Sequence, residues 1–224
     1  MGTYPIAAPR PARLREPPPR PATASPQLIV LAGPNGAGKS TAAPELLRDV
    51  FHMRTFVNAD EIARGLSAFA PDRAALAAGR VMLARLRVLE QARSDFAFET
   101  TLSGIGARRL IQRSLGDGYQ VHLVYLWLRS PELALDRVRT RVAAGGHDVP
   151  AVDVRRRFAR GLTAFATELR GSVTTWRAFD AGTTPPRLIA AGVRGTRDHI
   201  LDPSAWAELA RTAGVDDPEA PHDA

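Results

Sequence analysis

Cysteine is absent from this sequence of 224 residues, and lysine occurs once, at Lys39, against 29 arginines. Without cysteine there can be no disulfide bond, no thiolate metal site and no cysteine nucleophile. No apolar run approaches the ~20 residues that cross a bilayer, and residues 1–26 lack the apolar stretch of a signal peptide. We therefore expect a cytoplasmic protein without a membrane partner.

The formal net charge of +7 raises the question of a nucleic-acid partner. The charge is unevenly placed, because the first 26 residues hold four arginines against one glutamate and the last ten hold four acidic residues and no basic one. Most other arginines fall on helix-like segments without the interleaved aromatic residues that stack on bases. The pattern favours a solvated basic surface over a nucleic-acid site.

Composition divides the chain into three parts. Residues 1–26 carry eight prolines and few large apolar side chains, so we expect a Pro/Arg-rich disordered tail, with a ligand for a partner domain as the alternative. Residues 27–213 have the length of one domain, and residues 214–224 form a flexible acidic tail.

Short apolar runs alternate with helix-length segments along residues 27–213, which predicts an α/β fold with a mostly parallel sheet between two layers of helices. Strands are expected at 28–32, 54–57, 96–98, 121–128, 173–179 and 187–191. Helices are expected from a Gly-rich loop to about Arg48 and at 71–93, 104–115, 131–146 and 151–169.

That Gly-rich loop follows the first strand and matches Gly-x4-Gly-Lys-Ser without a mismatch, and its nine residues are Gly33, Pro34, Asn35, Gly36, Ala37, Gly38, Lys39, Ser40 and Thr41. Its glycines allow backbone N–H groups to surround an anion, and the next helix adds its dipole. Lys39 would reach the β- and γ-phosphates, Ser40 would hold Mg²⁺, and Thr41 would bond a phosphate oxygen. The loop predicts a site for ATP and Mg²⁺.

The phosphate loop is accompanied by four further motifs, which are Asn58-Ala59-Asp60, Phe98-Glu99-Thr100-Thr101-Leu102-Ser103-Gly104, Arg141, and Gly145-Gly146-His147-Asp148-Val149-Pro150. Together they resemble the zeta-toxin family of P-loop kinases, in particular its small stand-alone branch, from about Leu28 to Ala191. The resemblance implies a P-loop kinase fold with a helical lid. It also implies ATP-dependent phosphorylation of a sugar hydroxyl of UDP-N-acetylglucosamine, and an antitoxin protein that blocks the nucleotide site.

Asp60 follows the second strand at the sheet edge where α/β proteins bind ligands. A carboxylate there can accept the proton of an attacking hydroxyl, and the resemblance gives Asp60 this role. The alternative is that Asp60 caps a short helix over residues 61–65. Asn58 is a candidate contact for the substrate.

Glu99 and Thr101 end the third strand at the same edge. By resemblance they bind the sugar or the phosphates of the acceptor. Glu99 could instead approach Mg²⁺ through a water molecule, and the remaining alternative is a solvated strand end.

The lid is expected over residues 137–157. Arg137 and Arg141 share one helix face, and Arg155, Arg156 and Arg157 open the next helix beyond the two glycines. An inserted arginine stabilises charge on the transferred phosphoryl group. Arg141 is the first candidate, followed by Arg156 and Arg157, with a solvated helix face as the alternative.

His147 follows the two glycines and is interpreted as a loop residue, because no second histidine lies nearby in the sequence. Three hypotheses for the whole chain remain. The first is a nucleotide-sugar kinase, the second a kinase that acts on a nucleoside, a dinucleotide or a polynucleotide end, and the third a non-catalytic ATP-binding module.

Overall fold

The computed structural model describes residues 24–67, 71–146 and 148–215. The terminal tails, for the most part, and His147 lie outside this part of the chain, so the expectations for them stay predictions. Within it, seven strands form one sheet in the order β2-β3-β1-β4-β5-β6-β7. Their bounds are β1 Gln27–Ala32, β2 Phe56–Val57, β3 Phe96–Thr100, β4 Gln120–Trp127, β5 Thr175–Asp180, β6 Arg187–Val193 and β7 His199–Ile200.

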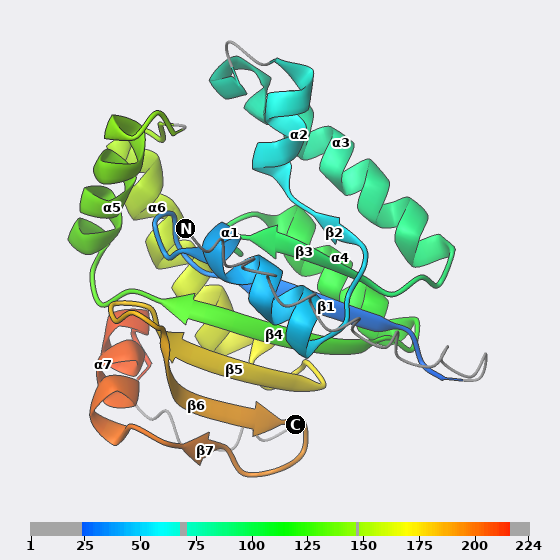
Figure 1. Ribbon diagram of the computed structural model, residues 1–224. Helices are drawn as coiled ribbons and strands as arrows, with labels where there is room; N and C mark the ends of the chain where they lie inside the picture. The colour runs from blue at the N-terminus through cyan, green and yellow to red at the C-terminus, as the bar shows by residue number, and fades with distance from the viewer. Residues whose placement is uncertain (1–23, 68–70, 147, 216–224) are drawn as a thin grey trace, which may run out of the picture.

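The first five strands pair in parallel, and β6 and β7 are added antiparallel at one edge. The predicted mostly parallel α/β class is therefore confirmed. β1 and β4 are central and nearly continuously buried, as expected for apolar strands covered on both faces. Helices flank the two faces of the sheet (Figure 1).

The helices are α1 Lys39–Ala43, α2 Ala59–Leu66, α3 Pro71–Gln91, α4 Ile105–Gly116, α5 Pro131–Ala143, α6 Ala151–Thr163 and α7 Pro203–Ala213, with π-helical continuations η1 Pro44–Val50 after α1 and η2 Ala164–Leu169 after α6. The helix predicted to run to about Arg48 changes to π geometry at Pro44, which lacks the N–H that a regular turn would use. The sequence interpretation missed α7 and β7, and it considered α2 only as an alternative.

Two groups of helices stand on either side of the loop that joins β1 to α1. Figure 1 shows α2 and α3 beyond the β2 edge of the sheet, and α5 with the start of α6 across the loop from them. α5 begins at Ser130, whose hydroxyl accepts a hydrogen bond from the Leu133 N–H at 3.1 Å, and ends before Gly145 at φ 82°. The carboxyl ends of β2, β3, β1 and β4 lie between these two groups of helices.

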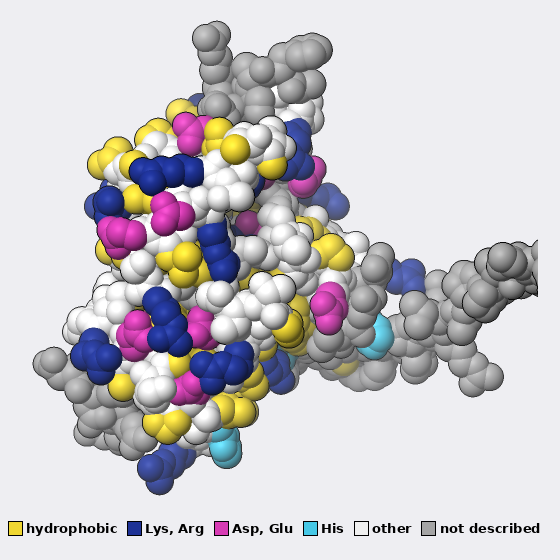
Figure 2. Space-filling view, turned by 60° about the vertical axis from the view of Figure 1, so that its left-hand side comes forward, with side chains coloured by type: hydrophobic (Ala, Val, Ile, Leu, Met, Phe, Trp, Pro, Cys, Tyr) yellow, Lys and Arg dark blue, Asp and Glu magenta, His cyan; other side chains and the backbone are white. Residues whose placement is uncertain are grey.

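The exposed arginines are mixed with acidic residues. Figure 2 shows both kinds of side chain interleaved over the face that carries α5 and α7. Four of the ion pairs of these exposed arginines are Arg129–Glu208, Arg139–Asp136, Arg155–Glu132 and Arg187–Asp202. Exposed pairs of this kind contribute about 0–1 kcal/mol each. On this face the positive side chains are therefore interspersed with acidic side chains, several of which pair with them. None of the helices in the described ranges is long and apolar enough to cross a membrane.

Candidate active site

The phosphate loop is packed too closely against its neighbours for any side chain at two of its glycines. A Cβ atom at Gly33, where φ is 144°, would lie 2.3 Å from the carbonyl oxygen of Leu126 on β4. At Gly36, where φ is 78°, it would lie 2.9 Å from the Ala134 oxygen and 3.0 Å from the Arg137 Cβ, both on α5. Glycine is required at both positions by conformation and by space. These contacts join the loop to the sheet and to α5.

Lys39 lies inside the loop, and its side chain is buried. Its Nζ donates hydrogen bonds to the carbonyl oxygens of Gly33 at 3.0 Å and Pro34 at 2.9 Å, and lies 3.7 Å from Glu99 Oε1. Burial lowers the pKa of the Lys39 ammonium group, while the carboxylates of Glu99 and Asp60 act in the opposite direction. The loop therefore holds a desolvated cation with Glu99 as its counter-ion.

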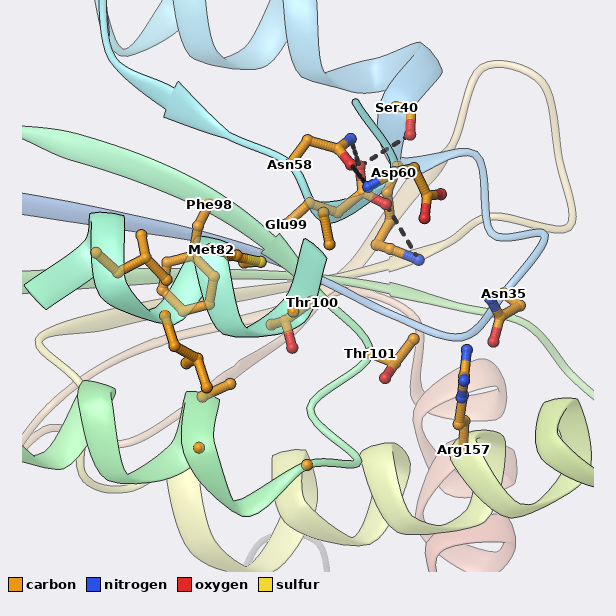
Figure 3. Close-up of a pocket in the computed structure, with 18 of the residues that line it drawn as sticks. Asn35, Ser40, Asn58, Asp60, Met82, Phe98, Glu99, Thr100, Thr101 and Arg157 are labelled. Carbon is orange, nitrogen blue, oxygen red and sulfur yellow. Dashed lines mark hydrogen bonds and ion pairs between the residues drawn. The ribbon is translucent and has the colours of Figure 1, made fainter. Parts of the chain in front are cut away.

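Glu99 connects three segments that are distant in sequence. Its Oε2 accepts hydrogen bonds from Ser40 Oγ at 2.9 Å and from Asn58 Nδ2 at 3.0 Å (Figure 3). The three residues meet because β1, β2 and β3 are parallel and their carboxyl ends lie at one edge of the sheet. Glu99 is thus a partner of Ser40 and Lys39, and it is not a solvated strand end.

Asn58 caps α2. Its Oδ1 accepts a hydrogen bond from the backbone N–H of Asp60 at 2.8 Å. The alternative interpretation of Asp60 as the helix cap is therefore wrong, because the residue two positions earlier fills that place. Asp60 lies in the first turn of α2 and lines the cavity beside the phosphate loop.

The segment after β3 forms a tight loop. Leu102 is fully buried with φ at 58°, an uncommon conformation for a non-glycine residue, and its N–H donates to Thr100 Oγ1 at 3.0 Å. Thr101 Oγ1 lies 2.8 Å from Ser103 Oγ. We call residues 100–104 the acceptor loop, after the acceptor contact that the sequence resemblance predicts for Thr101.

Helix α6 touches this loop through Gly161. A Cβ atom at Gly161 would lie 2.1 Å from the carbonyl oxygen of Thr101, so only glycine permits this approach. Arg157 is one turn earlier on the same face of α6 and lines the cavity near Thr101 and Asn35 (Figure 3). Sequence reasoning missed Gly161, although a glycine inside a predicted helix was a signal that could have found it.

The cavity has a volume of about 660 Å³, within the range of small-molecule sites. One side is polar and includes the phosphate loop, Asp60 and Glu99. The other side, which we call the apolar wall, is formed by side chains of α3, β3 and α4, namely Leu76, Met82, Leu83, Leu86, Phe98 and Ala107, with Gly79 and Gly106 between them. The helical spacing of Met82, Leu83 and Leu86 predicts a shared helix face, but no sequence pattern indicates that Phe98 and Ala107 complete the same surface.

Three lid arginines reach the cavity, and they are Arg137, Arg141 and Arg157. Arg156 does not line it, since its guanidinium group lies 2.7 Å from the Asp153 carboxylate on the outside of α6. A Cβ atom at Gly146 would lie 2.6 Å from Arg141 Cγ, so this glycine leaves room for the Arg141 side chain. The structure thus places Arg157, and not its neighbour Arg156, at the cavity.

A metal site made of protein ligands alone is not present: among the residues that the structure describes, no group of three or more His, Asp or Glu side chains could hold an ion. Mg²⁺ in phosphoryl-transfer sites takes phosphate oxygens and waters besides one or two protein oxygens. The Ser40 hydroxyl beside the Glu99 carboxylate fits that requirement.

The protein-family model for zeta toxins matches residues 12–173. A curated relative, an uncharacterized protein of Haemophilus influenzae, is 29% identical over 130 residues, which make up 58% of this chain and 91% of that protein.

Three solved structures share the fold. A chain of the AvrRxo1-ORF1:-ORF2 complex superposes with a TM-score of 0.61 and 18% identity over 83% of this chain, and this chain covers only 63% of its length. The complex with ATP gives a TM-score of 0.60 and 19% identity over 90% of this chain and 67% of that chain. The PezAT toxin-antitoxin system of Streptococcus pneumoniae gives 0.54 and 15% identity over 75% of this chain and 72% of that chain. These likenesses confirm the predicted P-loop kinase fold.

Proposed function

The chain belongs to the zeta toxin family, and on that basis we propose that it transfers the γ-phosphate of ATP to a sugar hydroxyl of UDP-N-acetylglucosamine. The observation that carries this proposal is the convergence of Lys39, Ser40, Glu99 and Asp60 on one cavity, which is also lined by lid arginines. Such a cavity joins a triphosphate site to a carboxylate that can act as a base.

ATP is the proposed phosphate donor. The family and the solved ATP complex of AvrRxo1-ORF1:-ORF2 support this choice. The nine residues from Gly33 to Thr41 would surround the phosphates with backbone N–H groups. Lys39 would turn from the Gly33 and Pro34 carbonyls toward the β- and γ-phosphates, because these anions are stronger partners than neutral carbonyl oxygens.

Mg²⁺ is the proposed cofactor, with Ser40 as its protein ligand and Glu99 beside it through water. When bound, Mg²⁺ supplies neutralisation of charge on the β- and γ-phosphate oxygens. Ser40 would then exchange its hydrogen bond to Glu99 Oε2 for the metal. This favours Glu99 near the metal, while Thr101 at the acceptor loop remains the proposed contact for the acceptor.

The proposed transfer begins when a hydroxyl oxygen of the acceptor attacks the γ-phosphorus. The bond to the oxygen that bridges the β- and γ-phosphates breaks, and ADP leaves with that electron pair. The hydroxyl proton passes to a carboxylate oxygen of Asp60. Lys39, Arg141 and Arg157 stabilise the negative charge that spreads over the γ-phosphate oxygens.

An antitoxin protein is the proposed partner. PezAT is a toxin-antitoxin system, and its fold is shared by this chain. An inhibitor of this kind would act by covering the phosphate loop, which forms one side of the cavity.

The test is transfer of labelled γ-phosphate from ATP to UDP-N-acetylglucosamine by the purified chain. We expect a phosphorylated nucleotide sugar, and a loss of about 10²–10⁴-fold in its formation for Asp60→Asn, since a positioned base contributes about that much. Lys39→Ala should lose about 10²–10³-fold. Arg156→Ala is the matched control, because Arg156 lies outside the cavity.

Three results would contradict the proposal. Consumption of ATP without label on the nucleotide sugar would remove UDP-N-acetylglucosamine as the acceptor. Label on a nucleoside, a dinucleotide or an oligonucleotide end in parallel reactions would identify the acceptor class instead. ATP binding without turnover in any of these reactions would show a non-catalytic module.

A further inference from the structure

Asn58 uses both ends of its side-chain amide inside the protein. Its Oδ1 accepts the N–H of Asp60 at 2.8 Å, and its Nδ2 donates to Glu99 Oε2 at 3.0 Å. Only 6% of the residue is exposed. A substrate that displaced either partner would leave a buried polar group unsatisfied. Both contacts tie Asn58 to the protein itself, while Asn58 also lines the cavity, so its interpretation as a substrate contact stays a prediction.

The same contacts form a continuous connection across the cavity floor. Ser40 Oγ donates to Glu99 Oε2 at 2.9 Å, the same oxygen accepts from Asn58, and Asn58 accepts from the backbone of Asp60. The connection begins at the hydroxyl that would hold the metal and ends at the residue that would accept the proton. Figure 3 shows these four side chains grouped together.

From this geometry we infer that Asn58 is a positioning residue, which holds Asp60 at a fixed place relative to Ser40 and Glu99. Asn58 fixes α2 from its first turn, because a capped N-terminus orients the backbone of the residues that follow. The hydrogen bond to Glu99 ties that turn to β3 and so to the phosphate loop. The inference rests on the proposed function for the role of Asp60, but not for the contacts.

The substitutions Asn58→Ser and Asn58→Asp separate the two contacts, because each should keep the bond to the Asp60 N–H and lose the bond to Glu99. Both are good helix caps, so both keep the bond to the Asp60 N–H. Serine is too short to reach Glu99, and aspartate presents an acceptor to a carboxylate. Alanine removes both contacts. A positioning role predicts that all three variants lose rate, while only Asn58→Ala loses the cap.

The first experiment measures kcat and both KM values with ATP and UDP-N-acetylglucosamine. Asn58→Ser and Asn58→Asp should lower kcat about 10- to 100-fold, the effect of a small misplacement of a reacting group. The KM values should stay within about twofold of the original, and the Tm should be retained. Asp202→Ala is the matched control, because it removes the cap of α7 outside the cavity and should lower Tm without lowering kcat.

The second experiment needs no phosphoryl transfer and uses hydrogen exchange of the amides of α2 with and without Mg²⁺ and ADP. In the unmodified protein, Mg²⁺ with ADP should slow exchange in the first turn of α2, because Ser40 and Glu99 are linked to it through Asn58. In Asn58→Ser the exchange should no longer respond, although nucleotide still binds.

The outcomes separate this inference from the proposed function. A higher KM for the acceptor with unchanged kcat would show that Asn58 touches substrate and would overturn the inference. The inference would also be overturned if Mg²⁺ with ADP did not slow hydrogen exchange in the first turn of α2 of the unmodified protein. A normal exchange response without nucleotide-sugar kinase activity would support the positioning role and reject only the acceptor.

Discussion

The two sides of the cavity differ in the kinds of groups that line them. The donor side consists of backbone and charged groups, and its residues contact one another: Lys39 meets Gly33, Pro34 and Glu99, and Glu99 meets Ser40. The acceptor side consists of the apolar wall and of the acceptor loop, which is pressed against α6. Under the proposed function, the donor side would determine the chemistry and the acceptor side would determine the choice of substrate. Substitutions on the donor side should therefore affect rate, and those in the apolar wall should affect acceptor affinity.

The largest effect is expected at the centre of the donor side. Lys39→Arg keeps a positive charge but places a planar fork where a compact ammonium group is held between the Gly33 and Pro34 carbonyls. We expect a loss of about 10³-fold in kcat/KM for ATP, comparable with Lys39→Ala. Steady-state kinetics check this. An active arginine variant would show that charge alone is sufficient and would remove the distinction between the two basic residues.

The next effect tests where the lid contributes. Arg157 lines the cavity from α6, whereas Arg156 is paired with Asp153 outside it. Arg157→Ala should lower kcat by about 10²-fold through lost stabilisation of the γ-phosphate charge, and Arg156→Ala should leave it unchanged. Equal losses in both variants, measured under the same conditions, would mean that α6 turns during the reaction.

A smaller effect is expected where the two sides are connected. Gly161→Ala forces a Cβ atom toward the Thr101 carbonyl and should shift α6 away from the acceptor loop, moving Arg157 with it. We expect kcat to fall about 10-fold by misplacement of this arginine. Gly65→Ala in α2 is the control, since a Cβ atom there meets nothing within 4 Å. If Gly161→Ala kept full activity and full stability, the close contact would have no role in placing the lid.

The smallest effect is expected in the apolar wall. A Cβ atom at Gly106 would lie 3.2 Å from Leu83 Cδ1, so Gly106→Ala narrows the wall by one methyl group. The KM for the acceptor should rise about threefold, less than the roughly 10-fold or more that one methyl group can change in a hydrophobic pocket, because the flexible end of Leu83 can give way, and the KM for ATP should be unchanged. Titration of each substrate at saturating concentrations of the other measures both constants. A rise in the KM for ATP would contradict the separation of the two sides.

The difference between the two sides also explains what the sequence could predict. The phosphate loop of the donor side is contiguous in sequence, and its glycines have positive φ angles, so one motif located it. The apolar wall joins α3 to β3 and α4 through contacts such as Leu83 with Gly106, which no local pattern records. The choice of Arg157 over Arg156 depends on the rotation of α6, and one residue along a helix changes direction by about 100°.

The cap of α2 shows a second limit of local reasoning. Asn58 and Asp60 are both residues that cap helices well, and the sequence does not say which of them begins the helix. The structure places the cap at Asn58, whose backbone is extended and whose Oδ1 accepts the Asp60 N–H, while its amide also donates to Glu99, 41 positions away. The alternation of strands and helices was sufficient to predict a mostly parallel sheet. It did not predict that β6 pairs antiparallel with β5, because the composition of a strand does not record the direction of its neighbour.

Lys39 has one more consequence, which follows from its being the only lysine. An amine-directed acylating reagent can modify a single side chain in this chain, and that side chain lies in the phosphate loop. Burial protects it and also lowers its pKa, so the neutral, nucleophilic amine forms at a lower pH than in an exposed lysine. Acylation measured at Lys39 should therefore fall as the loop is filled, and a ligand that occupies the loop can be titrated by the label that it prevents at this residue.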